Sequence, residues 1–342
     1  MNKEEYIRIS NLSVGYQHGK TPNIVAGNLN AVVSKGELVC LLGANGTGKS
    51  TLMRTMCGFQ PFFDGQVDIL GKSIRKMDER EISRLVSVVL TDRIVVPNAT
   101  VYELVSYGRS PYTGLLGRVK GLDRDMIDQA ISQCGIEYKK NDLLTSLSDG
   151  ERQKAFIAKA LAQDTPVIIL DEPTAFLDLP ARIEVIQLLR RVASLSGKSV
   201  LLSTHDLDLA LQMADKLWLL HPGGPLVAGN PEDLLLGNAL QDLFRSKGIV
   251  FDTRTGLFRV EYQHDLELPV KGHGFEYVLL RRAFARKGVK LVPHQDNENT
   301  WIEIDRETGR PFRFYRDKKL VASEETVEKI VHITLTDFER VT

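Results

Sequence analysis

The chain has 342 residues, which allows a large core and favours more than one domain. Lysine plus arginine and aspartate plus glutamate both number 44, so no basic excess indicates nucleic-acid binding, and we expect no nucleic-acid partner. Three cysteines lie far apart without a CxxC pair, which argues against disulfides and favours a reducing cytosol. We find no apolar signal segment and no run long enough to cross a bilayer, so any membrane role is expected to act through a partner.

Apolar and polar residues alternate in two early segments, 6–14 and 24–33, which predicts two half-buried strands. Tyr16 lies between them, in a segment with several glycines that we expect to be a loop. A lone aromatic in a loop more often covers the core than binds a ligand, so position alone does not give Tyr16 a role.

A glycine-rich loop follows a short apolar run. The run, 38–42, has the composition of a buried parallel strand, and residues 51–56 predict a helix. Between them, residues 43–50 fit the pattern G-x-x-x-x-G-K-S/T at every fixed position. Glycines let the backbone wrap a phosphate, and a helix start offers N–H groups to it. We therefore expect Lys49 to reach the β- and γ-phosphates and Ser50 to hold Mg²⁺, with further nucleotide contacts from Gly43, Asn45, Gly46, Gly48 and Thr51.

Strands and helices alternate through the middle of the chain. We expect further strands at 65–71, 86–90, 167–170, 199–202 and 217–220, helices at 101–107, 124–134 and 147–163, and a long loop at 108–118. This alternation predicts an α/β fold with a mostly parallel sheet.

Two carboxylates, Asp171 and Glu172, follow directly after the apolar run 167–170. The carboxyl ends of strands are where α/β sheets bind ligands. Alone, such a pair is more often an ordinary strand end; beside a phosphate loop the balance reverses. We expect Asp171 to hold Mg²⁺ and Glu172 to polarise the water that attacks the γ-phosphate.

Four further motifs give the sequence a family resemblance. Residues 147–151 form Leu-Ser-Asp-Gly-Glu, and residues 175–178 form Ala-Phe-Leu-Asp. With Tyr16 and His205, they resemble the motifs of ATP-binding cassette ATPases in order and spacing. In that family they are the signature, with Asp149 where glycine is commoner, the D-loop, the aromatic that stacks on adenine and the switch histidine that touches the γ-phosphate.

The resemblance covers about residues 7–220 and implies a P-loop nucleotide-binding domain, 1–242, with an antiparallel β subdomain and a helical subdomain. It implies an ATPase that works as a head-to-tail homodimer. Each ATP would lie between Lys49 of one copy and Ser148 and Gly150 of the other, with Asp178 also at the nucleotide. Closure of the dimer would drive integral-membrane permease subunits, which places the chain at the cytoplasmic face of the inner membrane.

Residues 99–105, 108–112 and 117–118 are similar to those of importer ATPases for iron–siderophore, haem and cobalamin. This similarity implies metal-chelate import, indirectly with a substrate-binding protein. The alternatives are an exporter or another substrate class, and a soluble cassette ATPase of translation or DNA repair. Against the soluble class, the chain has one phosphate loop and one signature, and no sustained heptad run.

Thr91 stands where the family usually has a glutamine that reaches Mg²⁺ and the attacking water, in a segment that contacts the membrane partner. Threonine is too short to span the same distance. We expect a water held by Thr91, or else Asp92, to take the place of that side chain.

The tail, 243–342, lies beyond the resemblance and predicts a small accessory α+β domain. The pattern D-x-x-T-G occurs at 252–256 and again at 305–309, each time between alternating runs. Two β-hairpin–helix units are one interpretation, with helices at 275–287 and 324–331, the second capped by Ser323. Chance similarity of two hairpin turns is the other. Regulation, dimerisation and ligand binding all remain open as roles.

Overall fold

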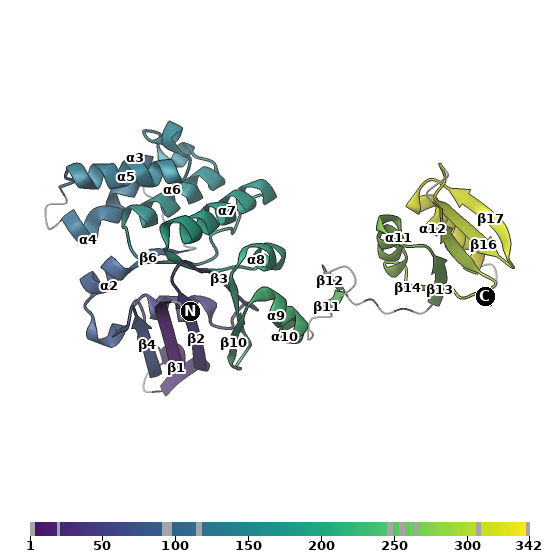
Figure 1. Cartoon of the computed structure of the whole chain (residues 1–342), viewed down its shortest axis with the longest axis horizontal. Coiled ribbons are helices and arrows are strands. Elements are labelled where there is room, and N and C mark those ends of the chain that lie inside the picture. Colours follow the sequence, from purple (N-terminus) through teal and green to yellow (C-terminus); the bar gives the residue numbers. More distant parts are fainter. Residues whose placement is uncertain are drawn as a thin grey trace. The chain divides into compact units, whose positions relative to one another are not determined.

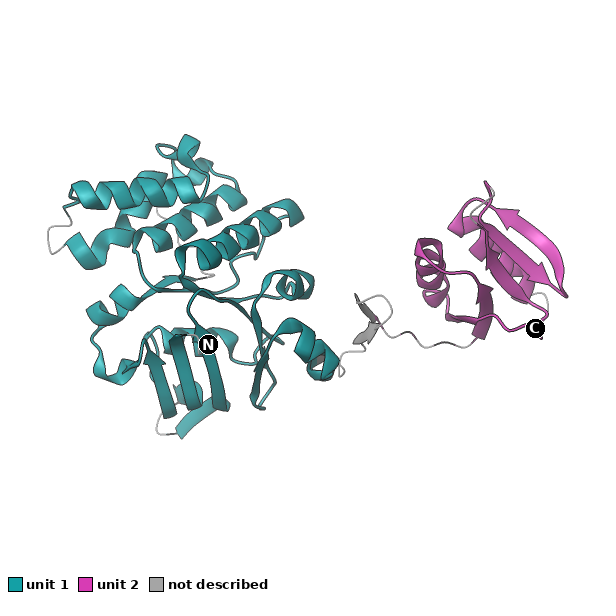
Figure 2. Cartoon of the chain, viewed as in Figure 1, with its two compact units in different colours: residues 1–243 teal, residues 244–342 magenta. Residues whose placement is uncertain are grey.

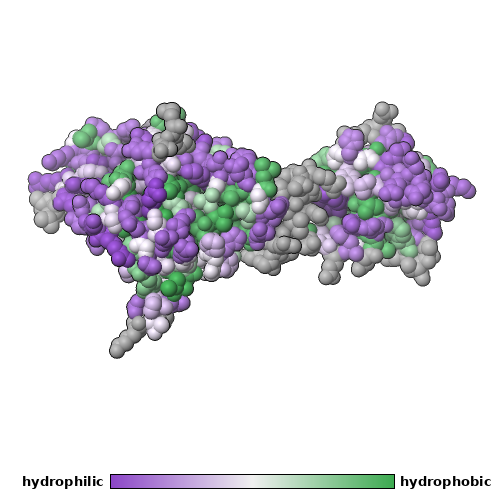
Figure 3. Space-filling model, turned by 60° about the horizontal axis from the view of Figure 1, so that its bottom comes forward, coloured by the Kyte–Doolittle hydropathy of each residue, from purple (hydrophilic) through white to green (hydrophobic). Residues whose placement is uncertain are grey.

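The computed structural model describes residues 4–18, 21–90, 98–113, 118–244, 249–252, 257–260, 262, 264, 266–305 and 309–339. The chain divides into two compact units, Met1–Leu243 and Phe244–Thr342, which Figure 2 shows in teal and magenta. Each unit has its own apolar cluster of buried side chains. On the face seen in Figure 3, polar side chains dominate the surface of each unit, and small apolar patches lie among these polar side chains.

The centre of the first unit is a six-stranded sheet in the order β10-β9-β3-β8-β7-β6, parallel except for the edge strand β10. All residues of three central strands are buried, which explains their continuous apolar sequences. The sequence predicts five of these strands and misses the half-exposed β10. The strands are β3 (Leu38–Gly43), β6 (Val86–Val89), β7 (Val167–Leu170), β8 (Ser199–Ser203), β9 (Lys216–Leu220) and β10 (Leu226–Gly229).

A four-stranded antiparallel sheet, in the order β2-β1-β4-β5, lies beside the six-stranded one (Figure 1). Helix α1 (Lys49–Met56) joins them, because Ile7 of β1, Met53 of α1 and Leu41 of β3 belong to one buried cluster. The helix that begins at the phosphate loop is thus held between two sheets. The antiparallel strands are β1 (Glu5–His18), β2 (Thr21–Ser34), β4 (Asp64–Ile69) and β5 (Lys72–Ser73).

The expected loop around Tyr16 is wrong. Tyr16 lies on β1 and pairs with Asn23 of β2, and the pairing continues to His18 and Thr21. Gly15 permits this close approach, because a Cβ there would lie 2.0 Å from the carbonyl oxygen of Asn23. Glycine here serves strand pairing and not a turn, which is why the sequence pattern misleads.

Helices α3, α4, α5 and α6 gather at one end of the first unit (Figure 1). The long loop expected at 108–118 is wrong for residues 108–113, since Tyr107–Arg109 form a 3-10 turn and Ser110–Thr113 form α4. Residues 114–117 lie outside the described residues, and residue 118 has no regular secondary structure. Arg109 is buried and donates from Nε to Asp123 Oδ1 over 2.9 Å. Gly108 packs on α6, where a Cβ would lie 2.2 Å from the Lys159 carbonyl oxygen. These contacts fix the segment in a helical form.

Further helices of the first unit alternate with its strands along the chain. The predicted α/β class, with an antiparallel sheet and a helical region, is confirmed. The helices not yet bounded are α2 (Glu79–Leu85), α3 (Val101–Ser106), α5 (Gly121–Gln133), α6 (Asp149–Ala162), α7 (Leu179–Ser196), α8 (Leu207–Met213), α9 (Pro231–Leu236) and α10 (Ala239–Phe244).

The second unit is built on a mixed five-stranded sheet in the order β14-β13-β15-β16-β17. Buried residues of α11 and α12, among them Phe284 and Ile330, pack with Ile302 and Phe314 of the sheet into one core. A separate hairpin joins β11 (Ile249–Asp252) and β12 (Leu257–Val260). The other elements are β13 (Leu266–Lys271), α11 (Phe275–Ala285), β14 (Val289–Pro293), β15 (Trp301–Ile304), β16 (Phe312–Arg316), β17 (Lys319–Glu324) and α12 (Val327–Glu339).

Both expected strand pairs are confirmed, because β11 pairs with β12 and β15 pairs with β16. The two units are not equivalent, since the first pair forms its own two-stranded sheet, whereas β15 and β16 belong to the five-stranded sheet. In each unit a further strand, β13 or β17, stands between the strand pair and its helix. The expected Ser323 cap is wrong, because Ser323 pairs with Arg313 inside β17 and the helix begins at Val327. The repeated turns themselves, 253–256 and 306–308, lie outside the described residues.

Candidate active site

The phosphate loop connects the end of β3 to the start of α1. Gly48 forms the helix N-cap with φ 99°, a left-handed conformation in which its Cβ would also lie 2.9 Å from Val25 Cγ1. Lys49 is 6% exposed, and its ammonium donates to the carbonyl oxygens of Gly43 at 2.9 Å and Ala44 at 3.2 Å. The lysine charge is therefore held over the loop, at the place where a helix start attracts anions.

Internal contacts make the loop compact. The Thr47 hydroxyl donates to the Ala44 carbonyl oxygen over 2.9 Å, and a Cβ on Gly43 would lie 2.7 Å from the Leu220 carbonyl oxygen. Gly46 has φ 80° and faces open space, and Asn45 beside it is exposed. The exposed tip leaves room for a ligand, while the base of the loop is fixed by packing.

The two carboxylates lie at the end of β7, beside the end of β8. Asp171 is buried and its Oδ1 accepts a hydrogen bond of 2.7 Å from the hydroxyl of Ser203. The same hydroxyl accepts the Glu172 N–H at 2.8 Å. No sequence motif indicates Ser203, because only the alignment of β7 and β8 in the sheet brings it to the carboxylates.

Glu172 and His205 form a pair that projects from this edge of the sheet. Glu172 has φ 49°, a left-handed conformation that is strained for a residue with a side chain. Its Oε1 lies 2.8 Å from His205 Nε2, and both side chains are partly exposed. The arrangement offers a carboxylate to a water molecule and lets the imidazole orient that carboxylate.

A second helix start carries the predicted signature residues. Ser148 caps α6 in a reciprocal box, in which its hydroxyl accepts from the Glu151 N–H at 3.2 Å and its own N–H donates to Glu151 Oε2 at 2.9 Å. This backbone hydrogen bond holds the pKa of the Glu151 carboxyl below its usual range. Asp149 forms an ion pair of 3.2 Å with Arg152.

Asp178 caps the next long helix, α7, and its Oδ1 accepts from the Ala181 N–H at 3.0 Å. A Cβ on Gly150 would lie 3.2 Å from the Ala181 Cβ, so the starts of α6 and α7 touch. Within one chain, the predicted signature and the predicted D-loop aspartate are thus neighbours.

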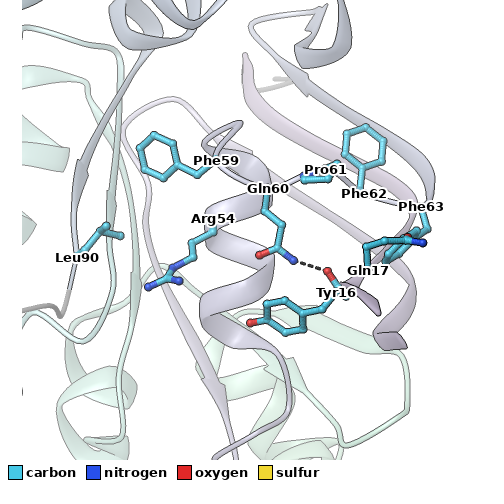
Figure 4. A pocket seen from close by; sticks show the side chains of 10 residues that line it. Tyr16, Gln17, Arg54, Phe59, Gln60, Pro61, Phe62, Phe63 and Leu90 are labelled. Carbon is cyan, nitrogen blue, oxygen red and sulfur yellow. Dashed lines mark hydrogen bonds between the residues drawn. The ribbon is translucent and has the colours of Figure 1, made fainter. Parts of the chain in front are cut away.

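Tyr16 borders a pocket of about 730 Å³ beside the phosphate-loop helix (Figure 4). Its hydroxyl lies 2.8 Å from Thr51 Oγ1, and the side chain is 47% exposed, which leaves part of the ring open for stacking. Arg54 lies on α1, and Leu90 directly follows β6. The other lining residues are Gly15, Gln17, Phe59, Gln60, Pro61, Phe62 and Phe63.

The donor atoms suit Mg²⁺ in a shell completed by phosphate and water. Ser50 and Asp171 supply a hydroxyl and a carboxylate, which are hard oxygen ligands. In the described residues no cluster of three or more His, Cys, Asp or Glu side chains is arranged to hold a metal by itself. Thr91, the third expected metal residue, lies outside the described residues.

Residues 26–175 match the family described as ABC transporter. An uncharacterised ABC transporter ATP-binding protein of Methanocaldococcus jannaschii is 35% identical over 75% of this chain and 87% of its own length. The iron(3+)-hydroxamate import ATP-binding protein of Bacillus subtilis is 34% identical over 71% of this chain and 90% of its own. The chain belongs to the ABC transporter ATP-binding proteins.

Solved structures of ABC transporters share the fold. One, described as a metal-chelate type transporter in an inward-facing conformation, covers 70% of this chain and 89% of its own, with TM-score 0.61 and 27% identity. Another is an ATP-binding cassette in a post-hydrolysis state with ADP and phosphate, with TM-score 0.57 and 25% identity over 66% of this chain and 98% of its own. The predicted family, fold and ATPase class are thereby confirmed.

In this ABC ATPase, the residues predicted to bind nucleotide lie at two helix starts and one sheet edge. Lys49, Ser50 and Thr51 begin α1, and Asp171, Glu172 and His205 follow strands β7 and β8 of the same sheet. Ser148 and Gly150 lie at the start of α6 instead. In the part of the chain that the structure describes, no helix is both long enough and apolar enough to cross a membrane.

Proposed function

We propose that this ABC ATPase energises import of a metal chelate through membrane permease subunits. The observation that carries the hydrolytic part is the Glu172–His205 pair beside the buried Asp171, at the sheet edge where β3 delivers the phosphate loop. Phosphoryl transfer needs positioned charges and an oriented nucleophile more than covalent chemistry. We propose that this site positions the charges and orients the attacking water.

The proposed roles follow from the contacts. Lys49 turns its ammonium from the Gly43 and Ala44 carbonyls to the β- and γ-phosphates, and the backbone N–H groups from Gly43 to Thr51 wrap them. Glu172 accepts a proton from the attacking water, and His205 holds the carboxylate and contacts the γ-phosphate. The Tyr16 ring stacks on the adenine.

Ser50 and Asp171 would hold Mg²⁺, which neutralises charge on the β- and γ-phosphate oxygens when bound. Thr91 belongs to this proposed shell through a water molecule. The donor set supports this assignment, because hydroxyl, carboxylate, phosphate and water together satisfy the octahedral oxygen preference of Mg²⁺.

We propose a homodimer in which Ser148 and Gly150 of one copy meet the nucleotide on Lys49 of the other, with Asp178 nearby. The start of α6 supports this, because a helix N-terminus favours a phosphate, although the capping box with Glu151 already uses part of its hydrogen-bonding capacity. Solved relatives include a bacterial ABC transporter cassette described as a dimer, with 25% identity.

The proposed cargo class rests on relatives named as import ATP-binding proteins for iron(3+)-hydroxamate and cobalamin, and on one named as a ferric enterobactin transport ATP-binding protein. Residues 1–242 would be the ATPase domain, docked on permease subunits at the cytoplasmic face of the membrane and served indirectly by a substrate-binding protein. Leu90, which lines the pocket beside α1, immediately precedes the segment that the family resemblance assigns to the permease. Residues 243–342 would be an accessory domain.

Glu172→Gln tests the hydrolytic part. The variant should bind ATP normally, hydrolyse it roughly 10²–10⁴-fold more slowly, and accumulate as an ATP-bound dimer visible by light scattering. Turnover within a few-fold of the wild type would remove Glu172 as the base.

Uptake of radiolabelled ferric siderophore, haem and cobalamin, compared in cells with wild type and Glu172→Gln, tests the cargo class. Loss of export with intact uptake would favour an exporter.

A further inference from the structure

We propose that Ser203 is a positioning residue for ATP hydrolysis, which sets both carboxylates at the end of β7. This inference rests on the proposed function, because it concerns the roles given there to Asp171 and Glu172. It adds a residue that stands in none of the sequence motifs and contacts the site only through the fold.

The sheet register places Ser203 beside the carboxylates. On one side Ser203 pairs with Leu41 of β3, and on the other Leu202 pairs with Leu170 of β7. In a parallel pair the next residues along both strands are neighbours, so Ser203 comes opposite Asp171. Ser203 is 0% exposed, and its hydroxyl therefore finds its partners inside the protein.

The two hydrogen bonds of Ser203 have fixed directions. A carboxylate accepts only, so the single hydroxyl proton goes to Asp171 Oδ1 at 2.7 Å. The hydroxyl oxygen then accepts the Glu172 N–H at 2.8 Å. One buried group thus orients the Asp171 side chain and the Glu172 main chain together.

Glu172 needs this support because its backbone is strained. Its φ of 49° lies in the left-handed region, and such a conformation persists only when neighbours fix it. Ser203 holds its N–H, and His205, two residues further along the same segment, holds its carboxylate at 2.8 Å. The end of β8 therefore sets the position of Glu172 from both ends.

Ser199 provides a matched control on the same strand. Its side chain is also 0% exposed and makes one hydrogen bond of 2.8 Å, to the Ser34 carbonyl oxygen at the other end of β8. Ser199→Ala and Ser203→Ala remove the same atoms from the same strand. They differ in whether the lost hydroxyl touches the carboxylates.

We expect Ser203→Ala to lower kcat about 10–100-fold, the usual range for loss of a group that orients a metal ligand, with a much smaller change in KM for ATP. Mn²⁺ affinity in the complex with a non-hydrolysable ATP analogue, measured by electron paramagnetic resonance, should fall about tenfold. Ser199→Ala should lower thermal stability and leave both quantities unchanged. Ser203→Thr, which keeps the hydroxyl, should retain activity. Ser203→Val, which has the volume of threonine but no hydroxyl, should not.

The outcomes separate this inference from the function on which it rests. If the wild type fails to hydrolyse ATP, or Glu172→Gln turns over like the wild type, the proposed function fails. If both behave as proposed but Ser203→Ala matches Ser199→Ala in kcat and Mn²⁺ affinity, the role of Ser203 is wrong. If the Ala variant does not fold, equal kcat for the folded Thr and Val variants overturns the proposal, and activity in Thr alone supports it.

Discussion

Helices α1 and α6 both begin at sites assigned to phosphate, yet their starts are built in different ways. Helix α1 starts at Gly48, and within the described part of the chain no side chain caps it and no acidic residue lies in its first turn. Helix α6 starts at Ser148 with a complete capping box, and Asp149 and Glu151 lie in its first turn. The first start keeps its N–H groups for an external anion, whereas the second satisfies part of its own.

This difference predicts the order in which the two helix starts contact the nucleotide. A helix start without its own acceptors attracts a phosphate directly, and here Lys49 adds a positive charge at 6% exposure. The α6 start already has an internal carboxylate, and Asp149 adds negative charge to its first turn. We therefore expect α1 to bind nucleotide in a single chain, and α6 to contribute only when a second copy brings its bound phosphates close.

Lys49→Ala should have the largest effect, because it removes the charged group at the start of α1 and lowers the affinity for ATP. Loss of a charged donor to phosphate costs about 1.5–3 kcal/mol, or roughly 10- to 150-fold in affinity. Isothermal titration of the single chain with ATP measures this effect. Lys159→Ala, which removes a lysine from α6 that is not assigned to nucleotide, serves as the control. An affinity like that of the wild type would show that the α1 start does not bind ATP.

Ser148→Ala should remove the α6 cap and cost about 1 kcal/mol of stability. ATP affinity of the single chain should stay unchanged, while the ATP-driven dimer of the Glu172→Gln background should weaken. Thr100→Ala is a matched control, because Thr100 caps α3 in the same kind of box with Glu103. It should show the stability loss in urea unfolding without the loss of dimer. If both variants weaken the dimer equally in light scattering, the effect of Ser148 is merely structural.

Asp149→Asn should have the smallest effect and opposite signs in two measurements. Removing a carboxylate from the first turn costs about 0.3–1 kcal/mol of helix stability. The exposed ion pair with Arg152 contributes little more, because both side chains are well solvated. ATP-driven dimerisation should strengthen, since one negative charge near the incoming phosphate is gone. Glu79→Gln is the control, because Glu79 holds the first position of α2 as Asp149 holds that of α6, and it should give the stability loss alone. Unchanged dimerisation in Asp149→Asn would place Asp149 away from the phosphate.

The sequence predicts those elements whose signal lies within a short stretch of the chain. Residues 38–42 and 167–170 are continuous apolar runs, and β3 and β7 lie there. Helix α7 is not among the predicted elements, although Asp178 followed by a proline near the first turn is a helix-start signal. The sequence predicts a loop at Tyr16, because a glycine in a strand and a glycine in a turn cannot be told apart without the partner strand.

Contacts between distant segments could not be predicted in the same way. Ser203 meets Asp171 because two strands align, and no local pattern encodes that register. Arg109 belongs to a segment that looks like a loop, and its burial follows from Asp123 on another helix. In the second unit, β13 and β14 pair in parallel across α11, so neither strand carries a hairpin signal.

The most direct test of the two-start account mixes Lys49→Ala with Ser148→Ala protein. If each ATP lies between Lys49 of one copy and Ser148 of the other, a mixed dimer has one site with both defects and one intact site. Each variant alone has a defect in both of its sites. ATP turnover in the mixture should therefore rise well above the sum of the two separate proteins. A mixture that never exceeds that sum would contradict a site shared between two copies.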